Sequence, residues 1–234
     1  MSTTIGFATI AQSPRDDVVP AMRPYMPGDL RIVECGCLDG LTRSEIDALG
    51  PVSGEVGIVA RLKEGGSTLL SHDKIMPRMQ QCVDQLMREE EADLVVVLCG
   101  ADWSAIRADR PVVNPGRLFP AVIGALAHGR RLGIIKPSAG QVEKERERYR
   151  EAGIDTVVTS ASPYAGDERL HLARVAAEQL RGADCDLVWM TCIGMDGAMR
   201  DVVAEVTGKP VVLAHALLAR IVAELLPSRQ PALV

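Results

Sequence analysis

One short pattern occurs twice in this sequence and restricts its fold more than any other feature. The two copies are Asp93-Leu-Val-Val-Val-Leu-Cys99-Gly100 and Asp186-Leu-Val-Trp-Met-Thr-Cys192-Ile193-Gly194. In both, Asp-Leu-Val is followed by three residues and then by cysteine, and each cysteine closes an apolar run. Two similar lobes, each containing one such strand, explain the repeat.

Short apolar runs alternate along the chain with longer segments of helical periodicity. This pattern is typical of α/β proteins with parallel sheets. Several runs lack polar alternation, as expected for strands whose two faces are both covered by helices. We expect strands at 4–11, 31–37, 94–99, 131–135, 156–160, 187–192 and 211–214, and helices at 14–25, 42–49, 74–91, 117–128, 140–152, 167–182, 197–207 and 217–226. Two short runs within residues 54–71 flank Lys63-Glu-Gly-Gly and predict a β-hairpin.

The predicted architecture is therefore two α/β lobes with a cleft between them. One lobe is expected to comprise residues 1–115 together with 205–234, and the other residues 116–204. The last predicted strand is given to the first lobe because it has no counterpart when the chain is simply divided in two.

The composition is that of a folded protein. Of the 234 residues, 47% are hydrophobic and 24% are charged, which allows a substantial core. The net charge of −5 and the pI near 5.5 argue against a nucleic-acid partner, which needs a basic face. The 3% of aromatic residues also leave few side chains for stacking on bases.

We expect neither a targeting segment nor a membrane partner. The N-terminus lacks the basic and apolar regions of a signal peptide, and no uncharged apolar stretch approaches the ~20 residues that span a bilayer. A cytoplasmic protein with reduced thiols is the resulting expectation. Its six cysteines are Cys35, Cys37, Cys82, Cys99, Cys185 and Cys192.

Metals and nucleotide cofactors have no support in the sequence. None of the cysteines lies in a C-x-x-C pair, and the four histidines lack metal-ligand spacing. The chain contains no G-x-G-x-x-G, Walker A or G-x-S-x-G motif. We therefore expect no metal, no nucleotide cofactor and no serine hydrolysis.

Cys99 and Cys192 are the candidate catalytic residues. Both fall at the carboxyl ends of predicted parallel strands, where open α/β sheets bind ligands. Two thiols that face each other across a cleft suit proton transfer at carbon, because one thiolate can remove a proton while the other thiol donates one to the opposite face. The reference pKa of cysteine, about 8.5, can be tuned towards neutrality. The alternative for either cysteine alone is a small buried core residue.

The segment that follows the first strand is a candidate for binding a substrate carboxylate. Ser13 suits the N-cap of the helix expected at 14–25, and Arg15 is a cation at a helix start, where positive charge is unfavourable. A guanidinium there can bind a carboxylate. The alternative is an ion pair with Asp16, Asp17 or Asp39. The candidate substrate-binding residues are Gln12, Ser13, Arg15, Gly100, Ala101, Ile193 and Gly194, the last four through their backbone.

Motifs spread over nearly the whole chain resemble the AroM family. They are Thr9-Ile-Ala-Gln12-Ser-Pro-Arg15-Asp-Asp-Val-Val-Pro20, Leu38-Asp39-Gly40-Leu41, Ala60-Arg61-Leu62-Lys63-Glu64-Gly65, Leu98-Cys99-Gly100, Ser162-Pro163-Tyr164, Thr191-Cys192-Ile193-Gly194 and Pro210-Val-Val-Leu. AroM proteins are similar in turn to the aspartate/glutamate/hydantoin racemase superfamily. The resemblance implies two flavodoxin-like lobes, cofactor-independent chemistry, and an active site between the lobes with one cysteine from each, here Cys99 and Cys192.

Two positions depart from the pattern of that superfamily. Many relatives have Asp before the second cysteine and Tyr three residues after it, where this chain has Thr191 and Met195. We expect Met195 to enlarge or dry the pocket relative to tyrosine. The identity of the substrate therefore does not follow from the resemblance.

Three functions agree with the sequence. The first is a racemase or epimerase that acts on a small carboxylate or a related acidic carbon centre through both cysteines. The second is a decarboxylase or cis–trans isomerase in which Cys192 alone is the proton donor or nucleophile. The third is a non-catalytic protein that binds a small ligand in the cleft. The sequence leaves a homo-oligomer open.

Overall fold

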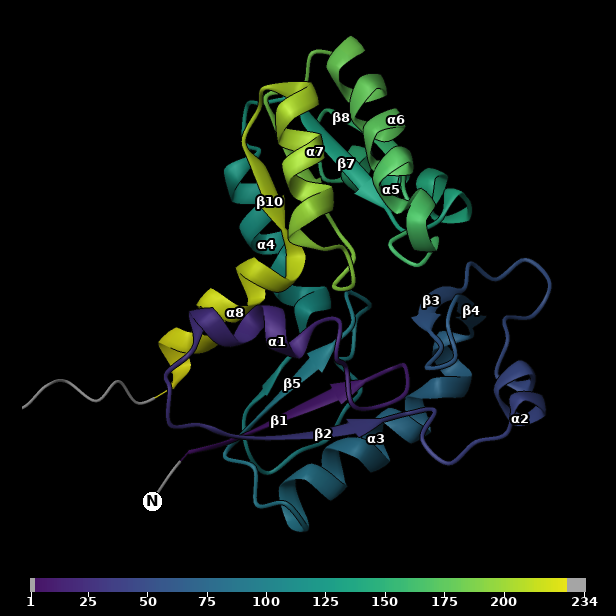
Figure 1. The fold of residues 1–234 in the computed structure, drawn as a ribbon, viewed down its shortest axis with the longest axis vertical. Helices are drawn as coiled ribbons and strands as arrows, with labels where there is room; N and C mark the ends of the chain where they lie inside the picture. Colours follow the sequence, from purple (N-terminus) through teal and green to yellow (C-terminus); the bar gives the residue numbers. More distant parts are fainter. Residues whose placement is uncertain (1–2, 227–234) are drawn as a thin grey trace, which may run out of the picture.

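The protein, represented by a computed structural model that describes residues 3–226, contains two parallel β-sheets (Figure 1). The strands of the first sheet are, in spatial order, β2 (Arg31–Gly36), β1 (Thr4–Thr9), β5 (Leu94–Leu98) and β6 (Val112–Val113). Those of the second sheet are β8 (Thr156–Ser160), β7 (Leu132–Lys136), β9 (Leu187–Met190) and β10 (Val211–Leu213). The predicted α/β class with two lobes of parallel strands is confirmed.

Each sheet has the same topology when its strands are numbered within their own lobe. Both orders are second, first, third, fourth, so that β1, β2, β5 and β6 correspond to β7, β8, β9 and β10. The repeated Asp-Leu-Val sequence forms the third strand of each lobe, β5 and β9. The two lobes are therefore pseudo-symmetric, and their cysteines occupy equivalent places.

The aspartates of the repeat connect the first and third strands of each lobe. The Asp93 carboxylate accepts a hydrogen bond of 2.9 Å from the backbone N–H of Thr4, and the N–H of Asp93 donates to the Thr4 carbonyl. In the second lobe, the Asp186 carboxylate accepts from the N–H of Arg131 at 2.8 Å, and the N–H of Asp186 donates to the Arg131 carbonyl. The same two hydrogen bonds thus explain why an aspartate begins both copies of the repeated sequence.

Helices cover both faces of each sheet, which explains why the central strands are buried along almost their whole length (Figure 1). The helices are α1 (Val19–Met22), α2 (Arg43–Ala48), α3 (His72–Arg88), α4 (Pro115–Leu126), α5 (Val142–Glu151), α6 (Arg169–Gly182), α7 (Gly197–Thr207) and α8 (Ala214–Leu225). Single turns of 3₁₀ helix lie at Arg23–Tyr25, Ala139–Gln141 and Gly166–Glu168. None of the helices within residues 3–226 is long and apolar enough to cross a membrane.

The first helix is shorter than the prediction over 14–25. It begins at Val19, and no side chain caps it. Ser13 does not act as an N-cap, because its N–H and its hydroxyl both bind the carboxylate of Asp39. Residues 14–18 therefore form a loop instead of the first helical turn.

The predicted hairpin is confirmed. β3 (Ile58–Arg61) and β4 (Ser67–Leu70) pair in antiparallel register, with Ile58 opposite Leu70. The amide of Gln141, in the second lobe, donates to the Gly57 carbonyl just before β3 at 3.0 Å. The hairpin thus belongs to the first half of the chain but contacts the second lobe.

The expected boundary that joined residues 205–234 to the first lobe does not match the sheets. β10 pairs with β9, with Val211 opposite Val188, so it is the edge strand of the second sheet. Its counterpart in the first lobe is β6, which has only two residues and was not predicted. From β10 the chain enters α8, which packs against α1 of the first lobe. Residues 227–234 lie outside the part that the structure describes.

One apolar cluster contains side chains from both lobes and joins them. It includes Phe7 of β1 together with Trp189 of β9 and Leu218 of α8. The rings of Phe119 and Trp189 meet edge to face, with 5.0 Å between their centroids. The two sheets are therefore held by a shared core as well as by the chain connections.

The expectation that all six cysteines are reduced is wrong for one pair. Cys35 at the end of β2 and Cys82 on α3 form a disulfide, with their Cα atoms 5.4 Å apart. The pairing arises because α3 packs across β2, which brings two residues far apart in sequence together. The other four cysteines are free.

We expect Asp93→Ala and Asp186→Ala each to lower the free energy of unfolding by about 1 kcal/mol, because each removes a carboxylate that accepts a backbone N–H. The double variant should lose about 2 kcal/mol, since the two sites lie in different lobes. Urea unfolding measures both effects, with Asp109→Ala on an exposed loop as the control. Single variants that unfold at the same urea concentration as the control would contradict this role.

Candidate active site

A cavity of about 910 Å³ lies between the two lobes. Its inner wall is made by residues at the carboxyl ends of strands from both sheets: Ile10 after β1, Cys99, Gly100 and Ala101 after β5, Lys136 and Pro137 of β7 and its following loop, Tyr164 after β8, and Thr191, Cys192 and Ile193 after β9. Parallel α/β sheets bind ligands at this edge, at the point where neighbouring strands lead to opposite faces. In each lobe that point lies between the first and third strands.

The structure brings the two candidate cysteines to the same cavity. Cys99 directly follows β5, and Cys192 follows β9 by two residues. The side chain of Cys99 is buried and that of Cys192 is half-buried, and both line the cavity. The predicted arrangement of one thiol from each lobe on a shared cavity is therefore observed.

Burial raises the pKa of both thiols. For Cys99 the pKa rises to about 11, although the backbone N–H of Ala101 opposes the rise. For Cys192 the rise is opposed by the backbone N–H of Gly194, two residues further on, as Ala101 is from Cys99. The charge of the Cys192 thiolate also raises the pKa of Cys99. Loss of the proton from Cys192 therefore disfavours loss of the proton from Cys99.

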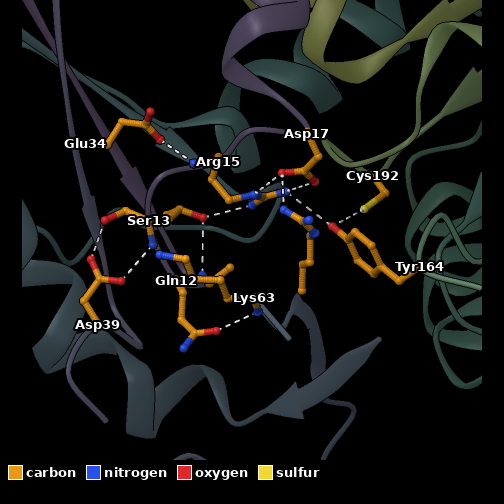
Figure 2. A network of polar contacts seen from close by, with 12 residues as sticks. Gln12, Ser13, Arg15, Asp17, Glu34, Asp39, Lys63, Tyr164 and Cys192 are labelled. Atoms are coloured by element: carbon orange, nitrogen blue, oxygen red, sulfur yellow. Dashed lines mark hydrogen bonds and ion pairs between the residues drawn. The ribbon is translucent and has the colours of Figure 1, made fainter. Parts of the chain in front are cut away.

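Arg15 is held in place by an ion pair with Asp17 (Figure 2). Its Nε and Nη2 donate to the two carboxylate oxygens of Asp17 at 2.8 and 2.9 Å, and its Nη1 donates to the hydroxyl of Thr9 at 2.9 Å. Arg61 of β3 binds the same carboxylate at 3.2 Å. Of the alternatives for Arg15, the ion pair with Asp17 is the one observed. Arg15 is among the residues that line the cavity, but Asp17 occupies the two-pronged face of its guanidinium.

Tyr164 connects Arg15 to Cys192 (Figure 2). Its hydroxyl lies 3.5 Å from Nη2 of Arg15 and 4.0 Å from Sγ of Cys192. Burial raises the pKa of Tyr164 well above its ordinary value, so the phenol stays protonated and can donate. Arg15 and Tyr164 both lower the pKa of Cys192 and stabilise its thiolate.

Gly194 lies against Tyr164 instead of lining the cavity. A Cβ atom at this position would lie 2.2 Å from the tyrosine hydroxyl. The glycine therefore allows the phenol to approach Cys192, and its own backbone N–H is directed to the thiol. This role differs from direct substrate binding.

Gln12 and Ser13 are not among the residues that line the cavity. The side-chain carbonyl of Gln12 accepts from the backbone N–H of Lys63 at 2.7 Å, and Gln12 borders a separate cavity of about 340 Å³. Ser13 is bound to Asp39. These two residues were assigned to the site because a helix start was expected there, whereas the segment forms a loop that directs them elsewhere.

Of the two departures from the superfamily pattern, only Thr191 borders the cavity. Its hydroxyl donates to the carbonyl of Ile135 at 3.2 Å. Met195 is fully buried in the core of the second lobe, among residues of α6 and α7. The expectation that Met195 enlarges or dries the pocket is therefore wrong.

Lys136 is a residue of the site that the sequence reasoning missed, and Tyr164 was noted only as part of a family motif. Lys136 directly follows the strand predicted at 131–135, so the rule applied to the cysteines would also have found it. Tyr164 lies four residues beyond β8, whose sequence Thr-Val-Val-Thr-Ser is partly polar, so that rule would not have found it. Lys136 forms an ion pair with Glu145, with 3.3 Å between Nζ and Oε2. Among the described residues, no group of three or more His, Cys, Asp or Glu side chains is arranged to hold a metal ion.

A two-lobed α/β protein with a thiol from each lobe at one cavity is the class that the fold and the site define. A family model described as AroM protein matches residues 5–226. The chain therefore belongs to the AroM family. No curated protein gives a significant match to the sequence.

Solved structures show where else the fold occurs. Glutamate racemase from Francisella tularensis subsp. tularensis SCHU S4, in complex with D-glutamate, is 12% identical with a TM-score of 0.58 over 96% of this chain and 81% of that chain. Unliganded arylmalonate decarboxylase is 17% identical with a TM-score of 0.58, over 99% and 96%. A mutant maleate cis-trans isomerase from Nocardia farcinica, with a covalently bound succinylcysteine intermediate, is 15% identical with a TM-score of 0.56, over 96% and 92%. At these identities the likeness concerns the fold.

We expect Tyr164→Phe to raise the pKa of Cys192, because it removes a hydroxyl that stabilises the thiolate. Alkylation of Cys192 by iodoacetamide at pH 8 should slow about fivefold, the equivalent of one hydrogen bond. Mass spectrometry of the Cys192 peptide over a pH series measures the change, and Cys185, a free cysteine that does not line the cavity, is the internal control in the same sample. An unchanged pH profile for Cys192 would show that the tyrosine does not stabilise its thiolate.

Proposed function

We propose that the protein is a cofactor-independent racemase or epimerase that acts on a small carboxylate or a related acidic carbon centre. The observation that carries this proposal is the position of Cys99 and Cys192, which reach one cavity from equivalent strand ends of two pseudo-symmetric lobes. A binding protein has no need of two matched thiols, and a single-cysteine enzyme needs one. Glutamate racemase, among the proteins of the same fold, supports this class of reaction.

In the proposed mechanism, the thiolate of one cysteine removes the proton from the carbon next to the carboxylate. The electron pair of the C–H bond passes into the carboxyl group, and the opposing thiol donates its proton to the other face of the carbon. The configuration is inverted, and the two cysteines have exchanged their protonation states. The charge of a Cys192 thiolate supports this scheme, because it raises the pKa of Cys99 and so keeps Cys99 protonated as the acid.

A single-cysteine decarboxylase or cis–trans isomerase is the second candidate. Arg15 and Tyr164 both stabilise the thiolate of Cys192, whereas burial raises the pKa of Cys99 to about 11. This asymmetry favours Cys192 as the proton donor or nucleophile, with Cys99 as part of the wall. The same fold occurs in arylmalonate decarboxylase and maleate cis-trans isomerase, which supports this alternative.

Solvent-deuterium exchange separates the two candidates. We expect the wild type to incorporate deuterium into both enantiomers of its substrate, found by screening a panel of chiral carboxylates and hydantoins. Cys192→Ser should exchange one enantiomer without inverting it, and Cys99→Ser should exchange the other. A serine hydroxyl is a far weaker acid than a thiol and cannot replace the missing base. Mass spectrometry and chiral chromatography measure exchange and inversion.

Cys185→Ser is the matched control, because Cys185 is a free buried cysteine of the second lobe whose side chain is not among those lining the cavity. It should retain both exchange and inversion. Full turnover by Cys99→Ser would contradict the two-base mechanism and support the single-cysteine alternative.

A further inference from the structure

Lys136 lies at the same edge of the second sheet as Cys192. It is the last residue of β7, and the register places its neighbour Ile135 opposite Met190 of β9. The N–H of Thr191 donates to the Ile135 carbonyl at 3.1 Å, so the segment leading to Cys192 runs directly beside Lys136. The lysine side chain is 16% exposed and borders the cavity.

The charge of Lys136 reaches both thiols. Its ammonium lowers the pKa of Cys99 as well as that of Cys192, although burial dominates both values. Arg15, in contrast, acts on the pKa of Cys192 without being among the main influences on Cys99. Lys136 is therefore a cation at the cavity that acts on both candidate bases.

The hydrogen-bonding capacity of Lys136 is only partly used. An ammonium group has three N–H donors, and the described residues give it one ion pair, with Glu145 at 3.3 Å. Glu145 also lies 3.9 Å from Nη1 of Arg148, so its negative charge is shared between two cations. Of the five N–H donors of Arg15, four are used by Asp17, Thr9 and Tyr164.

We propose that Lys136 binds the carboxylate of the substrate and holds the adjacent carbon between Cys99 and Cys192. This inference rests on the proposed function of the cavity as a site for small acids. It gives Lys136 the role that sequence reasoning assigned to Arg15, and it gives Arg15 the separate role of stabilising the Cys192 thiolate with Tyr164. The substrate class is then an anion whose carboxylate lies next to the reacting carbon.

Two alkylating reagents test this assignment without knowledge of the substrate. In both reactions the thiolate sulfur forms a bond to the CH₂ carbon while the C–I bond breaks and iodide leaves with the electron pair. Iodoacetate carries a carboxylate next to this carbon, and iodoacetamide carries a neutral amide. A change in thiol pKa affects both rates alike, so the ratio of the two rates reports recognition of the carboxylate.

We expect the ratio of iodoacetate to iodoacetamide rates at Cys99 and Cys192, measured by mass spectrometry of each peptide, to exceed that of free cysteine. Lys136→Met should lower the ratio about tenfold, as expected for loss of a charge-assisted hydrogen bond. Lys136→Arg should retain most of it. Lys136→Met combined with Glu145→Gln should show the same loss while leaving no unpaired buried carboxylate.

Lys209→Met is the matched control, since Lys209 also belongs to the second lobe and also forms a 3.3 Å ion pair, with Asp184, but is not among the residues that line the cavity. Its ratio should equal that of the wild type. A wild-type ratio no higher than that of free cysteine, or a ratio unchanged in both Lys136→Met variants, would overturn the proposal. If the ratio falls in Lys136→Met but the wild type exchanges deuterium into no substrate, the role of Lys136 in binding a carboxylate would be supported and the proposed racemase activity would be overturned.

Discussion

Burial of both faces of two parallel sheets is the constraint on which the rest of this structure depends. Because helices cover each sheet on both sides, the residues of the central strands β1, β5, β7 and β9 are buried, apart from Lys136 at the end of β7. Polar and reactive side chains can then reach a ligand only beyond the strand ends. The two lobes direct their carboxyl edges to a common cavity, so Cys99, Lys136, Tyr164 and Cys192 meet there although they come from four different strands.

Neighbouring charges then give the two thiols of the cavity different pKa values and different roles. A thiolate at Cys192 raises the pKa of Cys99, so that Cys99 stays protonated while Cys192 is the base. Arg15 is fixed by Asp17 and acts with Tyr164 on Cys192, so that one side of the cavity is better suited to a thiolate than the other. This asymmetry is compatible with reversible proton transfer between two unequal bases, and it is also the feature that a single-cysteine enzyme would share.

The sequence predicted those parts of the structure that depend on local pattern. The strands before Cys99 and Cys192 were found because each is an unbroken apolar run with the same Asp-Leu-Val beginning. The partner of Arg15 was not found, because the choice among three nearby carboxylates depends on how the loop at 14–18 folds. β10 was given to the wrong lobe because its counterpart β6, two residues long, carries no recognisable pattern. The Cys35–Cys82 disulfide depends on the packing of α3 across β2 and has no local signal.

A crystal structure of the protein with a bound acid, one that the wild type exchanges with deuterium, tests the central claim most directly. The two-thiol mechanism predicts that the carbon next to the carboxylate lies between Sγ of Cys99 and Sγ of Cys192, within about 3.5 Å of each. A ligand whose reacting carbon faces Cys192 alone, with protein atoms between it and Cys99, would contradict the mechanism.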